Sequence, residues 1–296
     1  MRPSLPLALL FAGSAPLAAQ MLPAPPLEVV QTGRFRDPAL RESSAVVASH
    51  RIPGVLFTVN DSGNPPEIFA FDSTGRVWGR WRVPGTRNRD WEAMSLGPCP
   101  AGSCLYIGDT GDDLERRDAA VIYRIREPTR LARFRGAPDP TPTDLDSAVV
   151  RYPDGPHDVE ALWVDDRADV YLASKGRHDA VHVYRLPGTA FGTGRGATAE
   201  LVQILRIGPD PDLGRMVTDA SRSPDGRRVA LRTYGALYIY QVADDGRLAE
   251  PTACNLAGLQ PQGEGIAWLD DRRILLTSES PPGTGAAPIL VVTCSG

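Results

Sequence analysis

Short runs in which apolar and polar residues alternate recur along the chain, and each run is bounded by Gly, Pro or Asp. β-Branched and aromatic residues dominate these runs, as in VLFTVN (55–60), CLYIGD (104–109), DVYLAS (169–174) and ALYIYQV (236–242). A two-residue period over about four to eight residues between turn residues predicts β-strands. No convincing amphipathic helix follows the first 20 residues, so the pattern predicts an all-β protein.

Five of these runs begin with or closely follow an acidic residue, in segments such as RESSAVVAS (41–49), NRDWEAMSLG (88–97) and HDVEALWVDD (157–166). The five acids are Glu42, Glu92, Glu160, Asp219 and Glu264, and the intervals between them are 50, 68, 59 and 45 residues. Each interval has room for a four-stranded antiparallel unit, which is the size of one propeller blade. The sequence therefore predicts a five-bladed β-propeller.

The last unit is short, because the 32 residues after Glu264 hold only three strand-like runs. The missing strand can come from LEVVQTGRFR (27–36), which would join the last blade, close the ring and remove exposed sheet edges. Six blades are the alternative, if the long segment 127–146 contains further strands.

The first 20 residues carry one arginine, a short apolar stretch and small residues near Ala18–Gln20. This composition is typical of a secretory signal peptide, and the apolar stretch is too short to span a membrane. We therefore expect residues 1–20 to be a signal peptide and residues 21–296 to form one β-propeller domain. No later stretch approaches about 18 uninterrupted apolar residues, so we expect a soluble monomer, secreted or periplasmic, without a membrane span.

Four cysteines in an exported chain indicate two disulfides among three possible pairings. Cys99 and Cys104 flank the turn PAGS, which favours a bridge between them and leaves Cys254 to pair with Cys294. A zinc site built on cysteine is disfavoured, because the chain has no second close cysteine pair and no matching histidine pair.

The net charge is −4, and Lys175 is the only lysine in a chain that otherwise uses arginine for positive charge. The most basic stretch, YRIREPTRLARFRG (123–136), is surrounded by acids and lacks an aromatic platform. A solvated outer strand explains it better than a nucleic-acid surface does, so we expect no nucleic-acid partner.

Propeller geometry gathers the candidate chemistry on one face of the disc. The innermost strand of a blade is followed by an antiparallel neighbour, so the start of the first strand and the end of the second share a face. The five acids would lie there beside the central channel. One ring further out would lie the second-strand ends NDSGN (60–64), GDTGDD (108–113), SKGRHD (174–179), RTYG (232–235) and SESPP (278–282).

Carboxylates that converge on one axis need a compensating charge, because two charges ~5 Å apart repel by roughly 1–3 kcal/mol. Ca²⁺ suits such a site, since it takes about 6–8 oxygen ligands in flexible geometry, whereas His157 is the only imidazole nearby that zinc could use. We expect Ca²⁺ with all five acids as ligands, some through water or paired with arginine: Glu42, Glu92, Glu160, Asp219 and Glu264. The alternative is that these acids hydrogen-bond backbone N–H groups of neighbouring blades.

The segments DWEAMSLG, LYIGDTGDD, VIYRIREP, HDVEALWV, VTDASRSPDGRRVALRTY and GEGIAW closely resemble a group of secreted bacterial propeller-like proteins without an assigned activity. More distantly, the five-fold acid pattern is similar to the calcium-activated nucleotidase (apyrase) family. That resemblance implies a five-bladed propeller with Ca²⁺ in its channel that cleaves nucleoside di- and triphosphates. Glu42, Glu92, Glu160 and Glu264 match the family's acidic ligands, whereas Asp219 lies near a place where the family tends to use serine, for which Ser221 is a second candidate.

Four residues at the expected channel mouth are candidates for catalysis. Asp61 and Asp109 could orient a metal-bound water or act as general base, although aspartates also cap turns. Lys175 and Arg232 could neutralise a phosphate, although Arg232 could equally pair with a channel acid.

Two further residue types are read as structural. His157 is favoured as a hydrogen-bonded or surface histidine rather than an acid or base. Trp91, Trp163 and Trp268 are expected to pack between blades.

The function expected from these features is Ca²⁺-dependent hydrolysis of a phosphoanhydride or phosphoester, with a small phosphate compound as substrate. A non-enzymatic, ion-stabilised scaffold that binds a glycan, a peptide or an envelope partner is the first alternative. Glycoside hydrolysis by channel carboxylates is the second. The chain has no G-x-S-x-G or H-E-x-x-H motif, so covalent serine hydrolases and zincins have no support.

Overall fold

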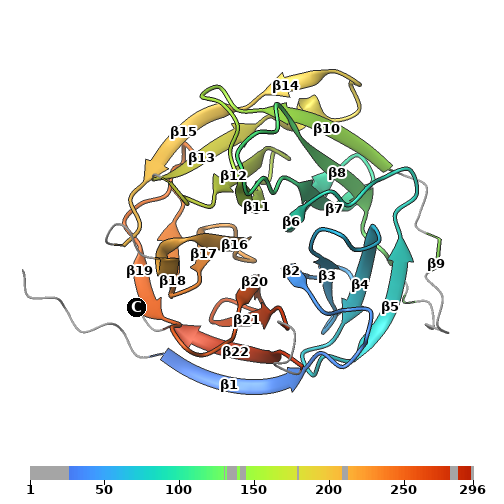
Figure 1. Ribbon diagram of the computed structural model, residues 1–296, viewed down its shortest axis with the longest axis vertical. Helices are drawn as coiled ribbons and strands as arrows, with labels where there is room; N and C mark the ends of the chain where they lie inside the picture. The colour runs from blue at the N-terminus through green and yellow to red at the C-terminus, as the bar shows by residue number, and fades with distance from the viewer. Residues whose placement is uncertain are drawn as a thin grey trace, which may run out of the picture.

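The computed structural model describes residues 27–129, 131, 139–140, 145–178, 180–208, 213–280 and 286–294. The expected signal peptide lies outside these residues. Within them the chain folds into five sheets arranged as a β-propeller, so the predicted all-β fold with five blades is confirmed (Figure 1). We number the blades 1 to 5 by the order of their innermost strands along the chain.

The first three blades follow the chain from the inside of the ring outward. Blade 1 is β2 (Ser43–Ala48), β3 (Leu56–Asn60), β4 (Glu67–Phe71) and β5 (Val77–Arg82), with the short β9 (Asp139–Pro140) parallel to β5. Blade 2 is β6 (Trp91–Cys99), β7 (Gly102–Asp109), β8 (Ala120–Arg126) and β10 (Leu145–Arg151), with β14 (Gly196–Thr198) parallel to β10. Blade 3 is β11 (Val159–Val164), β12 (Val170–Ser174), β13 (Val181–Leu186) and β15 (Glu200–Leu205).

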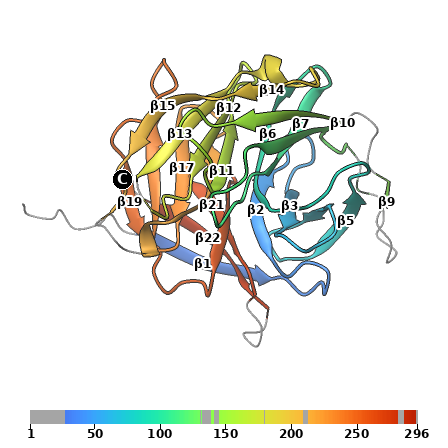
Figure 2. The ribbon, with the colours of Figure 1, turned by 45° about the horizontal axis from the view of Figure 1, so that its top comes forward.

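The last two blades complete the ring. Blade 4 is β16 (Val217–Arg222), β17 (Arg228–Thr233), β18 (Ala236–Gln241) and β19 (Thr252–Asn255). Blade 5 is β20 (Gly263–Trp268), β21 (Arg273–Ser278), β22 (Pro288–Cys294) and, outermost, β1 (Leu27–Arg34). β1 runs antiparallel to β22, with Leu27 opposite Cys294, and lies along the outside of the disc (Figure 2).

Segment 127–146 does not supply a sixth blade in the part of the chain that the structure describes. It contributes the two-residue β9 and the start of β10, and both belong to blades already counted. Two 3₁₀ turns, Gly188–Ala190 and Leu213–Arg215, are the described helices, and neither is long enough to cross a membrane.

The core consists of apolar layers between neighbouring blades. The innermost strands are buried on both faces, which explains their continuous apolar runs, whereas outer strands such as β15 keep an exposed face. Trp91 packs between blades 1 and 2, Trp163 between blades 3 and 4, and Trp268 between blades 4 and 5, as the sequence predicts. These layers fix the blades against one another and hold the innermost strands around the channel.

Both favoured disulfide pairings are confirmed. Cys99 and Cys104 close the β6–β7 hairpin. Cys254 in β19 is joined to Cys294 in β22, so this bridge connects blade 4 to blade 5.

Candidate functional site

Each innermost strand carries a β-bulge close to its start. The pairing with the second strand shifts after Ser43, Trp91, Val159, Val217 and Gly263 in the five blades. A bulge inserts an extra residue and redirects its side chain. The residues at this position form what we call the bulge set: Ser44, Glu92, Glu160, Thr218 and Glu264.

The bulge set brings three glutamates together and leaves out two of the five expected acids. Glu92 interacts electrostatically with both Glu160 and Glu264, so carboxylates from three blades converge on the channel. Glu42 lies two residues before the bulge of blade 1, where Ser44 takes the equivalent position. Asp219 lies one residue after the bulge of blade 4, where Thr218 takes it.

Asp219 has a different set of partners from the three glutamates. One of its oxygens accepts hydrogen bonds from the backbone N–H groups of Val46 (3.3 Å) and Ile266 (2.9 Å), and the other from Ala220 (2.8 Å). The side chain is fully buried and reaches from blade 4 to the innermost strands of blades 1 and 5. The contacts of Asp219 therefore match the alternative, in which the acid hydrogen-bonds backbone N–H groups of neighbouring blades.

A second layer of residues surrounds the bulge set at the mouth of the channel. In every blade, the residue that follows the second strand donates its backbone N–H to the carbonyl of the residue two before the bulge. These following residues form what we call the rim set: Asp61, Thr110, Lys175, Tyr234 and Glu279. Their acceptors are Glu42, Asp90, Asp158, Met216 and Gln262. The second-strand ends therefore crown the same face as the bulges, as the propeller geometry requires.

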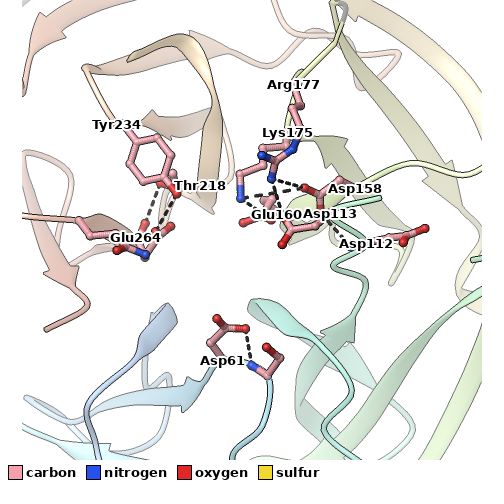
Figure 3. A network of polar contacts seen from close by, with 12 residues as sticks. Asp61, Asp112, Asp113, Asp158, Glu160, Lys175, Arg177, Thr218, Tyr234 and Glu264 are labelled. Carbon is pink, nitrogen blue, oxygen red and sulfur yellow. Dashed lines mark hydrogen bonds and ion pairs between the residues drawn. The ribbon is translucent and has the colours of Figure 1, made fainter. Parts of the chain in front are cut away.

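Figure 3 shows how the side chains lie around the mouth. Glu264 and Tyr234 face the channel from one side, Glu160 and Lys175 from another, and Asp61 from a third. Tyr234 donates a hydrogen bond to Oε1 of Glu264 (3.0 Å). The other carboxylate oxygen of Glu264, Oε2, is buried and has no hydrogen-bond partner among the described residues.

Carboxyl groups outnumber positive charges at this mouth, and their pKa values rise accordingly. Removal from water, and then the charges of Glu160 and Asp61, raise the pKa of Glu92 well above its usual range. Burial raises the pKa of Glu264 to about 7, and burial together with the Asp61 carboxylate raises that of Asp90 to about 7. The mouth therefore holds crowded carboxyl groups, and a nearby positive charge would favour their ionised forms.

Lys175 lies at the mouth, as expected, and is engaged by the protein itself. Its Nζ is 2.8 Å from Oε1 of Glu160 and 4.0 Å from Oδ2 of Asp158. Burial alone would lower the pKa of Lys175, but the Glu160 carboxylate outweighs it and raises the pKa above the usual value. Arg177 is placed next to it, 3.2 Å from Asp158.

Asp61 also lies at the mouth, next to two carboxyl groups. Single oxygen atoms of Asp61, Asp90 and Glu92 lie within 4.8 Å of one another. Gly111 makes room for this arrangement, because a Cβ atom there would come within 2.6 Å of Cγ of Asp90 and 2.7 Å of Cγ of Glu92.

Asp109 and Arg232 are buried, and the charge of Arg232 acts on the channel acids Glu264 and Asp219. Asp109 is buried, accepts the backbone N–H of Asp90 (3.1 Å) and forms an ion pair with Arg117 (3.0 Å). Arg232 is buried against blade 5, where it donates to the carbonyls of Gly265 (2.9 Å) and Thr277 (2.7 Å) and to the side chain of Gln260. Both side chains hold other parts of the site in place, and neither is open to a substrate in this arrangement.

Sequence reasoning did not select several residues that the structure brings to the mouth: Asp90, Asp158, Tyr234, Glu279, Ser44 and Thr218. A signal for two of them is present, because DWE (90–92) and DVE (158–160) share an aspartate two residues before the glutamate. The spacing of two places both carboxyl groups of each pair on the channel side.

Fold and site together define a five-bladed β-propeller with an acid-lined channel. No protein-family model and no curated protein sequence matches the chain. Among solved structures, the PQQ-bound aldose sugar dehydrogenase of Streptomyces coelicolor is similar, with 17% identity and a TM-score of 0.50 over 91% of this chain and 99% of that chain. A glucose dehydrogenase is similar with 11% identity and a TM-score of 0.51, over 91% of this chain and 100% of that one.

These likenesses show the fold alone, because so low an identity carries no information about the site. The matches therefore support the β-propeller fold of this chain. The resemblance to calcium-activated nucleotidases receives no support from these matches and stays a prediction.

Proposed function

We propose that this protein is a cation-dependent hydrolase of phosphoesters or phosphoanhydrides, with Ca²⁺ held in the channel by the bulge set. The observation that carries the proposal is the convergence of Glu92, Glu160 and Glu264, from equivalent bulges of three blades, with one buried oxygen of Glu264 unpaired. A buried carboxylate oxygen without a partner is costly unless a cation or a donor satisfies it.

The chemistry of the donors favours a hard cation. The glutamates supply carboxylate oxygens, and Ser44 and Thr218 supply hydroxyl oxygens at the two remaining bulges. Oxygen ligands in a flexible arrangement suit Ca²⁺. Lys175 compensates only part of the negative charge, since its Nζ binds Glu160 and lies 4.0 Å from Asp158.

Residues around the channel mouth could provide the groups that hydrolysis of a phosphate needs. When bound, Ca²⁺ would polarise a phosphoryl oxygen and lower the pKa of a bound water. Lys175 and Arg177 bring positive charge to the mouth, where an anionic substrate would lie. Asp90, whose pKa is raised to about 7, can take a proton from water near neutral pH, with Asp61 beside it to orient that water.

The test is release of inorganic phosphate from ATP, ADP and p-nitrophenyl phosphate, in CaCl₂ and in EGTA. We expect phosphate release in CaCl₂ only. The Glu92→Gln variant should lower it by about 10–100-fold, and the exposed Glu250→Gln, which removes one charge far from the channel, should leave it unchanged. Phosphate release that is equal in CaCl₂ and EGTA would overturn the proposal.

One observation favours the scaffold as the second candidate. Lys175 and Arg177 are already paired with the protein's own carboxylates, Glu160 for the first and Asp158 and Asp113 for the second. A scaffold predicts that Ca²⁺ raises the melting temperature while none of the phosphate substrates is turned over.

A further inference from the structure

A second group of metal-ligating side chains lies outside the channel, beside blade 3. Asp154 and His157 belong to the segment between β10 and β11, and His182 is the second residue of β13. Each offers one ligand atom, and the three atoms lie within 4.8 Å of one another. Nε2 of His157 is 3.3 Å from Oδ1 of Asp154, and Nδ1 of His182 is 3.0 Å from Oδ2 of Asp154.

His157 provides an independent sign that this group has a ligand. Its side chain is only 10% exposed, and Nε2 is a buried atom without a hydrogen-bond partner among the described residues. Asp154 lies within ion-pair distance of this nitrogen, but not in hydrogen-bond geometry. A buried imidazole nitrogen without a hydrogen-bond partner costs folding free energy, and a metal ion would coordinate its lone pair.

The surroundings fix both imidazoles in place. The His157 ring packs against Tyr152 and Tyr184, with ring centroids 5.8 and 5.5 Å apart. Tyr184 donates to Asp154 (2.9 Å), and its hydroxyl lies 3.1 Å from Nδ1 of His182. The backbone N–H of His182 is held by the Ser174 hydroxyl (2.8 Å). Such outer contacts orient metal ligands and set their affinity.

We propose that Asp154, His157 and His182 bind a transition-metal ion, Zn²⁺ in the first place, through one carboxylate oxygen and two imidazole nitrogens. Zinc takes such ligands at about 2.0–2.1 Å, so the ligand atoms of a tetrahedral site lie about 3.3 Å apart. Nδ1 of His182 is hydrogen-bonded to Oδ2 of Asp154 at 3.0 Å, and Nε2 of His157 lies 3.3 Å from Oδ1, so both imidazoles reach the same carboxylate group at about this distance. The two imidazole ligands also distinguish this site chemically from the channel, whose ligands are all oxygen atoms and suit Ca²⁺.

With three protein ligands, the fourth position of the zinc would be open to water or to a small anion. The site lies on the same face as the mouth, because His157 directly precedes Asp158, which binds Lys175 and Arg177. The zinc site does not depend on the channel cation, so each can be tested alone.

The experiment is a titration of Zn²⁺ against protein purified without a polyhistidine tag, by competition with a chromogenic zinc indicator. It is run in EGTA-free buffer with excess CaCl₂ to occupy the channel, and repeated without calcium. The variants are His157→Gln and His182→Gln, and the matched control is His50→Gln, which removes an exposed imidazole in blade 1. Circular dichroism establishes that each variant is folded.

We expect one zinc ion per chain, with affinity lowered ~100-fold or more in His157→Gln and His182→Gln and unchanged in His50→Gln. X-ray absorption at the zinc edge of the wild-type protein should show two imidazoles and oxygen ligands at ~2.0–2.1 Å. This measurement decides the matter even if a histidine variant fails to fold. Absence of one-to-one binding, an absorption spectrum without imidazole, or equal affinity in all three folded variants would overturn the proposal.

Discussion

Glu92 and Glu160 occupy equivalent bulges, yet replacing them by glutamine should have opposite effects on stability when no cation is present. Glu92 lies among other carboxyl groups, and an oxygen of Asp61 is within 4.8 Å of one of its own. Repulsion at that distance is on the order of 1–3.5 kcal/mol for effective dielectric constants between about 80 and 20. Glu92→Gln removes this repulsion, or removes the free-energy cost of protonating the Glu92 carboxyl group where protonation relieves it. The variant should therefore be more stable than the wild type in EGTA.

Glu160 differs because it neutralises Lys175, whose Nζ is 2.8 Å away and whose side chain is 11% exposed. Glu160→Gln leaves that ammonium group buried, and its remaining ion-pair partner among the described residues is Asp158, at 4.0 Å. Breaking a buried pair by removing one partner costs about 3–5 kcal/mol, and Asp158 should keep the loss at the lower end.

Thermal unfolding at pH 8, by differential scanning calorimetry in EGTA and in CaCl₂, separates the two effects. One kcal/mol corresponds to about 2–4 °C in a protein of this size, so Glu92→Gln should raise the melting temperature by at least ~2 °C in EGTA and Glu160→Gln should lower it. In CaCl₂ at about 100 times Kd the wild type gains about 2.7 kcal/mol, and Glu92→Gln should gain less because it has lost a ligand. Shifts of the same sign for both variants in EGTA would contradict the different charge environments of Glu92 and Glu160. An undiminished calcium effect in Glu92→Gln would show that Glu92 is not a ligand.

Three further predictions concern pH, the channel wall and the contact between blades 4 and 5. Burial raises the pKa of Glu264 to about 7 and that of Glu279 to about 8, so the folded protein without a cation holds protons that the unfolded chain releases. Its melting temperature should therefore fall as the pH rises from about 4.5 to 8. The increase in melting temperature caused by CaCl₂ should grow over the same pH range. A calcium effect that is independent of pH would contradict this. Gly111→Ala should lower calcium affinity by about 10–100-fold in a calorimetric titration, because the added Cβ displaces Glu92; unchanged affinity would show that the glutamate is not a ligand. Arg232→Met should leave two buried carbonyls of blade 5 without their donor and cost about 1–3 kcal/mol for each, with or without calcium; an unchanged melting temperature in both conditions would contradict this.

The sequence predicts the propeller well because the strands of a blade mostly follow one another directly along the chain. Strands such as β3, β7, β12 and β18 follow directly from alternating runs between turn residues, and the acid-led segments give the number of blades. The outer strand of blade 4 is less visible, since β19 covers only Thr252–Asn255 and pairs with β18 after a polar segment.

The site is harder to predict because its register depends on bulges. An extra residue in the innermost strand moves every later side chain to the other face, and no residue type marks where it falls. Following the acidic residues alone therefore selects Glu42, two residues early, and Asp219, one residue late, in the blades whose bulges carry Ser44 and Thr218.

The same one-residue precision governs the rim. The rim residue is the one just after the second strand, which is Asp61 in blade 1 and Lys175 in blade 3, as expected. Asp109 and Arg232 precede that position by one and two residues and therefore lie inside the second strands, where both side chains are buried. The sequence does not indicate His182 for another reason. It lies 25 positions after His157, and the fold brings the two rings together, with centroids 5.1 Å apart.

The most direct test of the central claim is an anomalous difference map from crystals of the protein grown in CaCl₂. We predict one Ca²⁺ in the channel, with oxygens of Glu92, Glu160 and Glu264 at about 2.3–2.6 Å. A channel that holds no ion at saturating calcium, with Lys175 still the charge that compensates Glu160, would contradict it.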